Sequence, residues 1–405
     1  MSSEVLGYLS IPIVAGLVGW LTNWLAIHLT FYPLEYKGIG PYIGWQGIIP
    51  AKARRMAALC VDSTLSRIGS VNDVIEQMDP ALIVDHIVRS IEPRIPELVD
   101  EIMLNRHDTL WRNLPKPAKR LVYKRVESEL PTIMAGLLED MSPKITELFD
   151  LKVLVIETLE KDRALLNRIF LDCGEKEFSF IIKSGLWFGC LFGIPQMLLW
   201  YLLPFSIVLP ICGFLVGWAT NWMALNLIFS PLNPIKIGGF SFQGLFLQRQ
   251  DQVSEAFCKI VTEEILTVEK VLDAMLNGDA RDRTRALIQK HFEQLVDDAI
   301  GIVKPFTQLA LGLEAFAELK SDTGNKAIEL SSTTLNDPVL NYERAQKVQA
   351  LMATRMKQLP SEEFQELLRP CFKEDEIKLI IIGGILGTLA GSAQATYIFG
   401  LNILG

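Results

Sequence analysis

The sequence lacks the motifs from which an active site or a metal site is usually built. Its six cysteines include no Cys-x-x-Cys arrangement, so a zinc or redox motif has no support. It contains no His-Glu-x-x-His, no Walker A loop, no Gly-x-Ser-x-Gly and no complete Gly-x-Gly-x-x-Gly. Acidic pairs such as Glu263 with Glu264 are typical of solvated helix surfaces. We therefore expect a protein that is not an enzyme and that binds no cofactor or metal.

An excess of positive charge is also missing. The chain has 39 Lys and Arg against 47 Asp and Glu, a net charge of −8, and nucleic-acid binders are usually basic. The opening Met-Ser-Ser-Glu lacks the basic segment of a secretory signal, and the apolar run behind it is too long for one. We expect this first run to be kept as a membrane helix, and we expect no nucleic acid among the partners.

Four long apolar runs are what the sequence does have. They raise the mean hydropathy to +0.27, and each exceeds the roughly 20 residues that a membrane-spanning helix needs. Pro204 and Pro210 divide the longest run, at 178–231, into a helical hairpin. The alternative is a set of buried soluble helices, but four runs almost free of charge favour a membrane. The predicted spans are 6–31, 178–203, 205–229 and 377–404.

The distribution of lysine and arginine predicts an orientation. The N-terminal tail, the turn at 204–210 and the C-terminal tip carry no lysine or arginine, whereas the other flanks do. Positive flanks usually stay in the cytoplasm. The two polar regions, about 51–176 and 248–373, are therefore expected to be cytoplasmic. The basic flanking residues are Lys37, Lys52, Arg54, Arg55, Lys176, Lys183, Lys236, Arg249, Lys373 and Lys378.

The sequence resembles itself at a constant offset, which places Gly217 opposite Gly19. Residues 16–33 read GLVGWLTNWLAIHLTFYP and residues 214–231 read FLVGWATNWMALNLIFSP. We predict a tandem duplication, with repeat 1 at 1–204 and repeat 2 at 205–405. Because each repeat holds two spans, both must have the same orientation, as in parallel-repeat membrane proteins. The predicted fold is all-α, with four transmembrane helices in two parallel-oriented repeats, each with a helical cytoplasmic region.

The second and fourth spans carry glycines spaced four residues apart, a glycine-zipper pattern. This spacing puts the glycines on one helix face, where two backbones can approach closely in lipid. We predict a helix-packing role, and the alternative is a glycine-lined conduction path. The glycines are Gly185, Gly189 and Gly193 in the second span, and Gly383, Gly387 and Gly391 in the fourth.

Several polar side chains fall inside the spans. Such side chains usually hydrogen-bond across helices. We expect Gln196 and Gln394 to be the partners of two Thr-Asn pairs on the neighbouring spans. His28 occupies the position that Asn226 takes in the second copy, which favours hydrogen bonding over proton relay. The Thr-Asn pairs are Thr22 with Asn23 and Thr220 with Asn221.

Glycine-rich turns at 38–50 and 238–246 follow the first and third spans. A basic cluster of Lys52, Arg54 and Arg55 follows the first turn. It is either a contact with anionic lipid headgroups or only a topology signal, and the second copy keeps just Arg249 of it.

The polar regions show helical spacing, as at Ile83, Ile87 and Ile91, and almost no strand signals. They are either packed bundles or amphipathic helices on the bilayer. Seven prolines are expected to divide the first region into short helices. They are Pro80, Pro93, Pro96, Pro115, Pro117, Pro131 and Pro143.

Together these motifs resemble a family. The Gly-Trp-x-Thr-Asn-Trp-x-Ala element, then Phe-x-Pro and Trp-Gln-Gly-Ile-Ile-Pro, is similar to bacterial membrane proteins grouped as domain-of-unknown-function family 445. The second copy departs at Leu247, where the turn proline would fall. The resemblance implies a membrane location and supplies no activity. We expect that membrane to be a bacterial inner membrane. The matching residues are Gly19, Thr22, Asn23, Ala26, Phe31, Pro33, Gln46, Gly47, Pro50 and Lys52, then Gly217, Thr220, Asn221, Ala224, Phe229, Pro231, Gln243 and Gly244.

Two functions remain in competition. The first is a non-enzymatic membrane scaffold or assembly subunit that contacts membrane lipids and other subunits, or self-associates. The second is a transporter or lipid-handling protein with a groove between the two repeats. The central spans contain no carboxylate, which disfavours ion transport and leaves lipid handling open.

Overall fold

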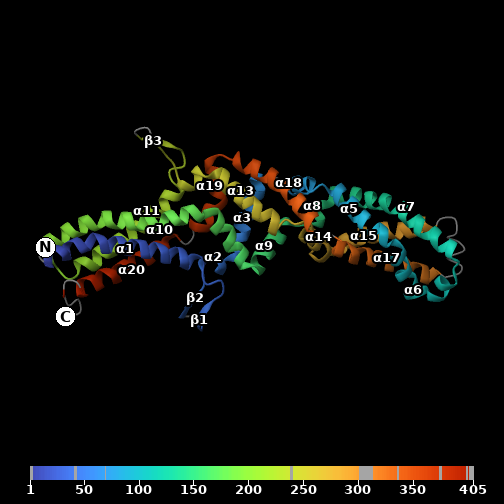
Figure 1. Cartoon of the computed structure of the whole chain (residues 1–405), viewed down its shortest axis with the longest axis horizontal. Coiled ribbons are helices and arrows are strands. Elements are labelled where there is room, and N and C mark those ends of the chain that lie inside the picture. Colours follow the sequence, from blue (N-terminus) through green and yellow to red (C-terminus); the bar gives the residue numbers. More distant parts are fainter. Residues whose placement is uncertain are drawn as a thin grey trace. The chain divides into compact units, whose positions relative to one another are not determined.

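The computed structural model describes residues 3–40, 43–68, 70–237, 240–300, 313–334, 337–373, 376–397 and 400. These residues are almost entirely helical and form two compact units (Figure 1). Unit 1 comprises Met1–Ile68, Val155–Phe257 and Ala353–Gly405, and unit 2 comprises Gly69–Leu154 and Cys258–Met352. Each unit therefore combines segments from both halves of the sequence.

The described residues of unit 1 include four helices that are long and apolar enough to cross a membrane, which agrees with the predicted number. Helix α10 extends about 60 Å at the usual rise of 1.5 Å per residue, so only part of it is needed to span a bilayer. It begins at Arg163, well before the predicted span, with Asp162 as its side-chain cap. The end of the fourth predicted span, beyond Tyr397, lies largely outside the described residues. The helices are α1 (Ser3–Phe31), α10 (Arg163–Leu202), α11 (Val208–Phe229) and α20 (Glu376–Tyr397).

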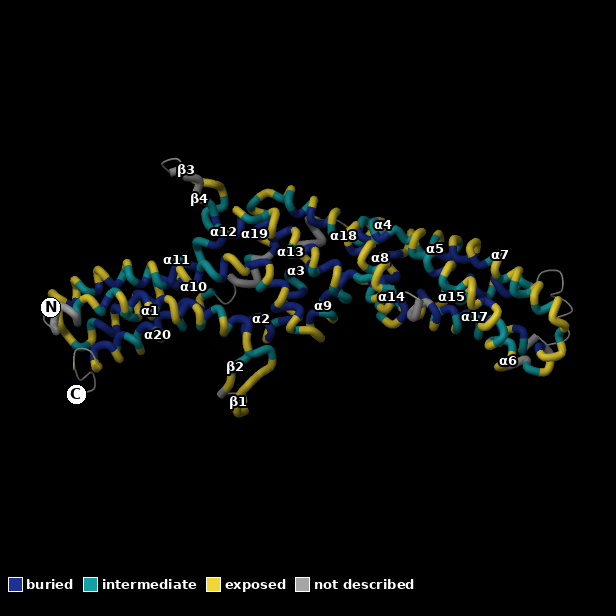
Figure 2. Tube along the Cα trace, in the orientation of Figure 1, coloured by how far each residue is buried: buried dark blue, intermediate teal, exposed yellow. Residues whose placement is uncertain are grey.

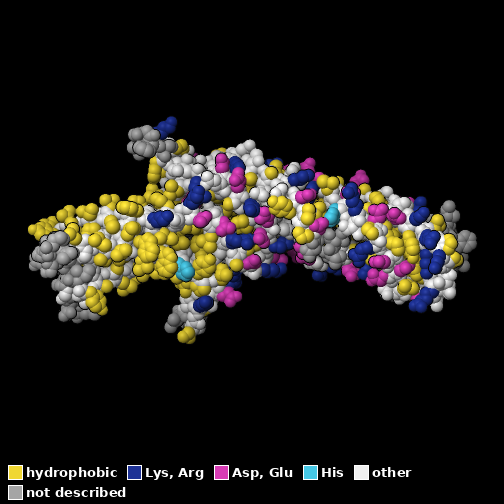
Figure 3. All heavy atoms as spheres, in the orientation of Figure 1, with side chains coloured by type: hydrophobic (Ala, Val, Ile, Leu, Met, Phe, Trp, Pro, Cys, Tyr) yellow, Lys and Arg dark blue, Asp and Glu magenta, His cyan; other side chains and the backbone are white. Residues whose placement is uncertain are grey.

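These four helices form one bundle in which α1 packs along α10 and α11 packs along α20. The two pairs meet through contacts of α10 with α11 and of α1 with α20. Small apolar clusters hold the pairs together, one of them around Ile11, Trp200 and Leu209. Figure 3 shows hydrophobic side chains over the outer surface of this bundle, as expected of helices that face lipid.

A short antiparallel hairpin follows each of the spans α1 and α11. The first pairs β1 (Lys37–Ile39) with β2 (Ile43–Trp45), and the second pairs β3 (Ile235–Ile237) with β4 (Phe240–Phe242). The sequence predicted only glycine-rich turns here. Strands this short cannot show a clear alternation of apolar and polar residues, which is why they were missed.

Short helices make up the rest of unit 1. Helix α3 packs against α19, and α12 also contacts α19. The helices are α2 (Ile48–Ala51), α3 (Ala53–Ile68), α9 (Leu151–Lys161), α12 (Leu245–Gln248), α13 (Gln250–Glu264) and α19 (Ser361–Lys373), of which α9 and α13 cross the boundary between the units.

Unit 2 is a helical bundle with its own hydrophobic core, visible as the buried stretches of these helices in Figure 2. Ile133 and Leu137 from the first half of the chain pack in this core with Ile288 and Phe292 from the second half. A packed bundle is therefore present where the sequence left two arrangements open. Its helices are α4 (Val71–Gln77), α5 (Pro80–Ile91), α6 (Ile95–Asn113), α7 (Lys116–Met141), α8 (Ile145–Leu148), α14 (Val268–Asn277), α15 (Arg281–Ile300), α17 (Leu313–Thr334) and most of α18 (Pro338–Lys357), with 3-10 turns at Glu92–Arg94 and Ser142–Lys144.

Most of the prolines mark helix starts in unit 2, as predicted. Pro80, Pro96 and Pro117 occupy first-turn positions, where the missing N–H costs nothing. Pro131 is an exception, because it lies inside α7. The prediction of a break there was wrong, and the burial of Leu130 and Met134 beside it shows that packing maintains the helix.

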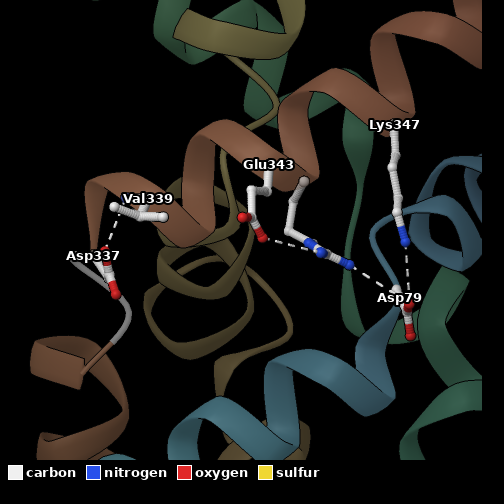
Figure 4. A network of polar contacts seen from close by, with 6 residues as sticks. Asp79, Asp337, Val339, Glu343 and Lys347 are labelled. Carbon is white, nitrogen blue, oxygen red and sulfur yellow. Dashed lines mark hydrogen bonds and ion pairs between the residues drawn. The ribbon is translucent and has the colours of Figure 1, made fainter.

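Ion pairs also join the two halves of the chain within unit 2. Figure 4 shows Lys347 of α18 pointing toward Asp79, and the Lys347 Nζ lies 3.4 Å from Asp79 Oδ2. The buried Arg344 Nη1 lies 3.5 Å from the same oxygen. Asp79 has a left-handed backbone, with φ of 57°, at the start of α5. Its carboxylate thus links the start of α5 to α18.

Candidate functional site: the helix contacts of the membrane bundle

The glycine row of α10 faces α1 along its whole length. An added Cβ on Gly185 would collide with the carbonyl oxygen of Gly19, and one on Gly189 would lie 2.8 Å from the Gly16 Cα. A Cβ on Gly193 would lie 2.5 Å from the Pro12 Cα. These separations are well inside ordinary van der Waals contact, so the two backbones touch and leave no space between the helices at these levels.

The glycine row of α20 faces α11 in the same way. A Cβ on Gly383 would collide with the Asn221 side chain, one on Gly387 with the Gly213 carbonyl, and one on Gly391 with the Leu209 carbonyl. The sequence analysis did not predict two further close contacts. They are Gly16 against Cys190 and Gly384 against Phe214.

The two span asparagines tie the helix pairs together. Asn23 Nδ2 donates to the carbonyl oxygen of Ile181 at 2.6 Å, and Asn221 Nδ2 donates to that of Leu379 at 2.8 Å. The two donors are separated by the offset of the sequence repeat, and so are the two acceptors. The adjacent threonines, Thr22 and Thr220, bond within their own helices to Gly19 and Gly217.

The expected pairing of the asparagines with glutamines was wrong, because Asn23 and Asn221 donate to backbone carbonyls instead. Gln196 and Gln394 are buried in the bundle. Within the described residues, Gln196 Oε1 and Gln394 Nε2 have no hydrogen-bond partner.

His28 lies on the outside of the bundle. Its ring stacks between Trp24, at 5.4 Å between centroids, and Tyr32, at 5.3 Å. No hydrogen bond from the His28 side chain is present among the described residues, so the expected hydrogen-bonding role is not seen there. At the matching position of the second half, Asn226 Nδ2 donates to the Trp222 carbonyl of its own helix at 2.9 Å. Neither side chain forms a polar path through the bundle.

The basic residues after the first hairpin differ in environment. Arg54 is mostly exposed and lies 3.6 Å from Glu160, while Arg55 is exposed and Lys52 is half-buried. Arg249, their counterpart after the second hairpin, instead points inward to Glu177 of α10. Arg249 Nη1 donates to both carboxylate oxygens, at 2.8 and 2.7 Å, and only 2% of the Glu177 side chain is exposed.

A small apolar cavity of about 30 Å³ lies beside Glu177. It is lined mainly by Phe31, Phe170, Phe178 and Phe229. That volume accommodates no more than a few water molecules. It is too small for a lipid or for another large substrate.

Carboxamide side chains hold the ends of α1 and α11. Asn167 Nδ2 donates to the Phe31 carbonyl at 2.5 Å, and Gln365 Nε2 donates to the Phe229 carbonyl at 2.8 Å. These carbonyls are at helix C-termini, where they have no partner within the helix. The sequence analysis missed both donors, although Asn167 and Gln365 are related by the same offset as the repeat, which was a usable signal.

The glutamines of the aromatic-Gln-Gly elements have a related role. Gln46 Nε2 donates to the Leu34 carbonyl and Gln243 Nε2 to the Leu232 carbonyl, both at 2.8 Å. Each glutamine therefore ties the returning strand of a hairpin to the chain that leaves the span.

In the described part of the chain, no three His, Cys, Asp or Glu side chains are grouped so that they could hold a metal ion.

Comparison with known proteins links the chain to membrane proteins. Matches include the UPF0754 membrane proteins of Staphylococcus aureus strains JH9, Newman and USA300, each 24% identical over 126 residues. The match covers 30% of this chain, and the chain spans about a third (33%) of the length of these curated relatives. No family model matches the sequence, and no solved structure matches it. The relatives' names agree with a membrane location and report no activity.

Proposed function

We propose that the chain is a tandem duplication whose copies have the same orientation, and that it belongs with the family 445 proteins that it resembles. Equivalent contacts support the duplication. The Asn23 and Asn221 hydrogen bonds, and the caps from Asn167 and Gln365, recur at the offset of the sequence repeat. One ancestral unit that was copied and kept its packing explains this coincidence.

The protein acts as a non-enzymatic membrane scaffold or assembly subunit. The observation that carries this proposal is the closure of the bundle by its glycine rows, with Gly185 against Gly19 and Gly387 against Gly213. Backbones in contact leave no conduit within either helix pair. The cavity of about 30 Å³ between the pairs has no room for a lipid, so lipid handling would need a groove on the outside of the bundle.

Unit 2 presents the surface for partners. It has its own core, and it carries exposed apolar side chains such as Val339 and Tyr342, 65% and 55% exposed. Other subunits of an assembly, or a second copy of the chain, bind there. In the bacterial inner membrane, with both polar regions in the cytoplasm, that surface faces cytoplasmic proteins. Lys52, Arg54 and Arg55 contact anionic headgroups at the same membrane face.

Two measurements test this function. Full-length protein in vesicles with fluorescent phospholipids should leave lipid exchange between leaflets at the protein-free rate. A photo-crosslinker at Val339 or Tyr342 should give discrete protein adducts in cells, while one at the lipid-facing Leu191 should give none of these bands. Rapid lipid exchange, together with no adduct from either unit 2 position, would favour the lipid-handling alternative.

A further inference from the structure

The two β-hairpins expose apolar side chains that nothing in the described chain covers. Ile39 in the first hairpin is 85% exposed, and Tyr36 just before it is 47% exposed. In the second hairpin, Ile235 is 50% exposed and Phe242 is 43% exposed. Two-stranded hairpins with such short strands are marginal in water, because they have little surface to bury. A further surface is therefore needed to hold them.

The hairpins are fixed at the ends of membrane spans. Trp45 Nε1 in β2 donates to the carbonyl of Leu29, in the last turn of α1, at 3.1 Å. Backbone N–H groups attach both hairpins in the same way, from Gly47 to Pro33 at 2.9 Å and from Gly244 to Pro231 at 3.0 Å. The hairpins leave the helical body close to where α1 and α11 end (Figure 1). Because the apolar spans end there, we expect the hairpins to lie near the boundary between lipid tails and headgroups.

Charge points to the same surroundings. Each hairpin has one exposed lysine, Lys37 in β1 and Lys236 in β3, and neither has an ion-pair partner among the described residues. The first hairpin also has the exposed Glu35 beside it, whereas residues 233–242 contain no acidic residue. Apolar and aromatic side chains next to a lysine suit the interface of an anionic bilayer.

We propose that both hairpins are interfacial anchors that lie in the headgroup region of the bilayer. The apolar side chains enter the outer part of the acyl region, and Lys37 and Lys236 contact anionic headgroups. The anchors set the depth of α1 and α11 in the membrane. This proposal needs only a membrane location and does not depend on the scaffold function.

Photo-crosslinking of the full-length protein tests the anchors. A benzophenone amino acid is placed singly at Ile39 or Ile235, and the protein is reconstituted in phosphatidylcholine vesicles with or without phosphatidylglycerol. Leu191, 57% exposed and midway along the predicted span 178–203, is the positive control. Lys124 is the negative control, since it is exposed on α7 of unit 2, and all four candidate spans belong to unit 1. Mass spectrometry measures the covalent phospholipid adducts.

The proposal predicts phospholipid adducts at Ile39, Ile235 and Leu191, and none above background at Lys124. Phosphatidylglycerol should raise the yield at Ile235 by about fivefold, the usual effect of one basic residue at an anionic surface. Lys236→Glu should abolish that increase and leave the yield at Leu191 unchanged. Adducts at Leu191 without any at Ile39 and Ile235 would overturn the proposal. Crosslinked dimers in place of lipid adducts would overturn it in favour of contact between two copies.

Discussion

Arg249 Nη1 lies 2.7 Å from Glu177 Oε2, which joins the segment after the second hairpin to the middle of α10. The two residues are 72 positions apart in the sequence. A carboxylate as buried as that of Glu177 is tolerated only with a charged partner, because desolvation of an isolated charge is costly. The pair therefore fixes a segment from the second half of the chain onto a helix of the first half.

Removing only one member of this pair should destabilise the protein strongly. Arg249→Met leaves the Glu177 carboxylate buried without its partner, at an expected cost of about 3 kcal/mol. Replacing both residues, with Glu177→Gln added to Arg249→Met, should cost less than Arg249→Met alone. Thermal unfolding in detergent measures both effects. A double variant less stable than the single one would show that the carboxylate is stabilised by other groups.

The asparagine bonds between helices should contribute modestly to stability. Asn23→Leu or Asn221→Leu removes a hydrogen bond to a neighbouring helix, and such bonds are worth roughly 0.6–2 kcal/mol in membranes. Asn226→Leu is the matched control, because Asn226 is half-buried and its side-chain hydrogen bond stays within its own helix. We expect lower melting temperatures for the first two variants and little change for the third. If all three variants have the same melting temperature, the hydrogen bonds between helices do not contribute measurably to stability.

The glycine contacts should tolerate no large side chain. Gly387→Leu must push α20 away from α11, at an expected cost of roughly 1–3 kcal/mol, the range seen for overpacking. Ala393→Leu makes a similar enlargement on the exposed side of α20 and should be nearly neutral. A Cys190→Leu variant of α10 would be a poor control, because the Cys190 sulfur lies against Gly16 of α1. Equal melting temperatures for Gly387→Leu and Ala393→Leu would contradict the packing role.

In unit 2, Tyr123 should ionise only at high pH. Burial raises its pKa from 10.0 to about 12, with help from its hydrogen bond to Asp100 and the charge of that carboxylate. Because the folded pKa is the higher one, the stabilisation from this bond is complete below pH 10 and is lost as the pH rises toward about 12.

The ultraviolet difference titration between the parent and Tyr123→Phe should therefore have a midpoint near pH 12. Asp100→Asn removes the negative charge and should move that midpoint toward 10. A midpoint near 10 in the parent would mean that Tyr123 is solvated and does not bond Asp100.

The spans could be predicted because a run of apolar residues is a property of the sequence alone. The constant offset between similar segments likewise pointed to matching residues, such as Asn23 and Asn221. The partners of these asparagines could not be predicted, since they are backbone carbonyls of Ile181 and Leu379. Every residue has a backbone carbonyl, so the residue type does not show which one accepts a hydrogen bond.

Contacts between segments far apart in the chain also could not be predicted from the sequence. The Arg249 side chain points inward to Glu177 and not outward to lipid. This orientation depends on how the second half of the chain packs against α10. The same holds for the core of unit 2, where Leu137 meets Phe292. A single sequence shows that each helix has an apolar face and does not show which other face covers it.

Labelling of introduced cysteines with a membrane-impermeant maleimide most directly tests whether both polar regions lie in the cytoplasm. The native Cys60 and Cys258 are buried and unsuitable as reporters. Lys161→Cys and Asp251→Cys report on the two polar regions, and Ile207→Cys, at a 61% exposed residue, reports on the turn between α10 and α11. In intact cells, only Ile207→Cys should react, and the other two should react after permeabilisation. Reaction of Lys161→Cys or Asp251→Cys from outside intact cells would contradict the arrangement.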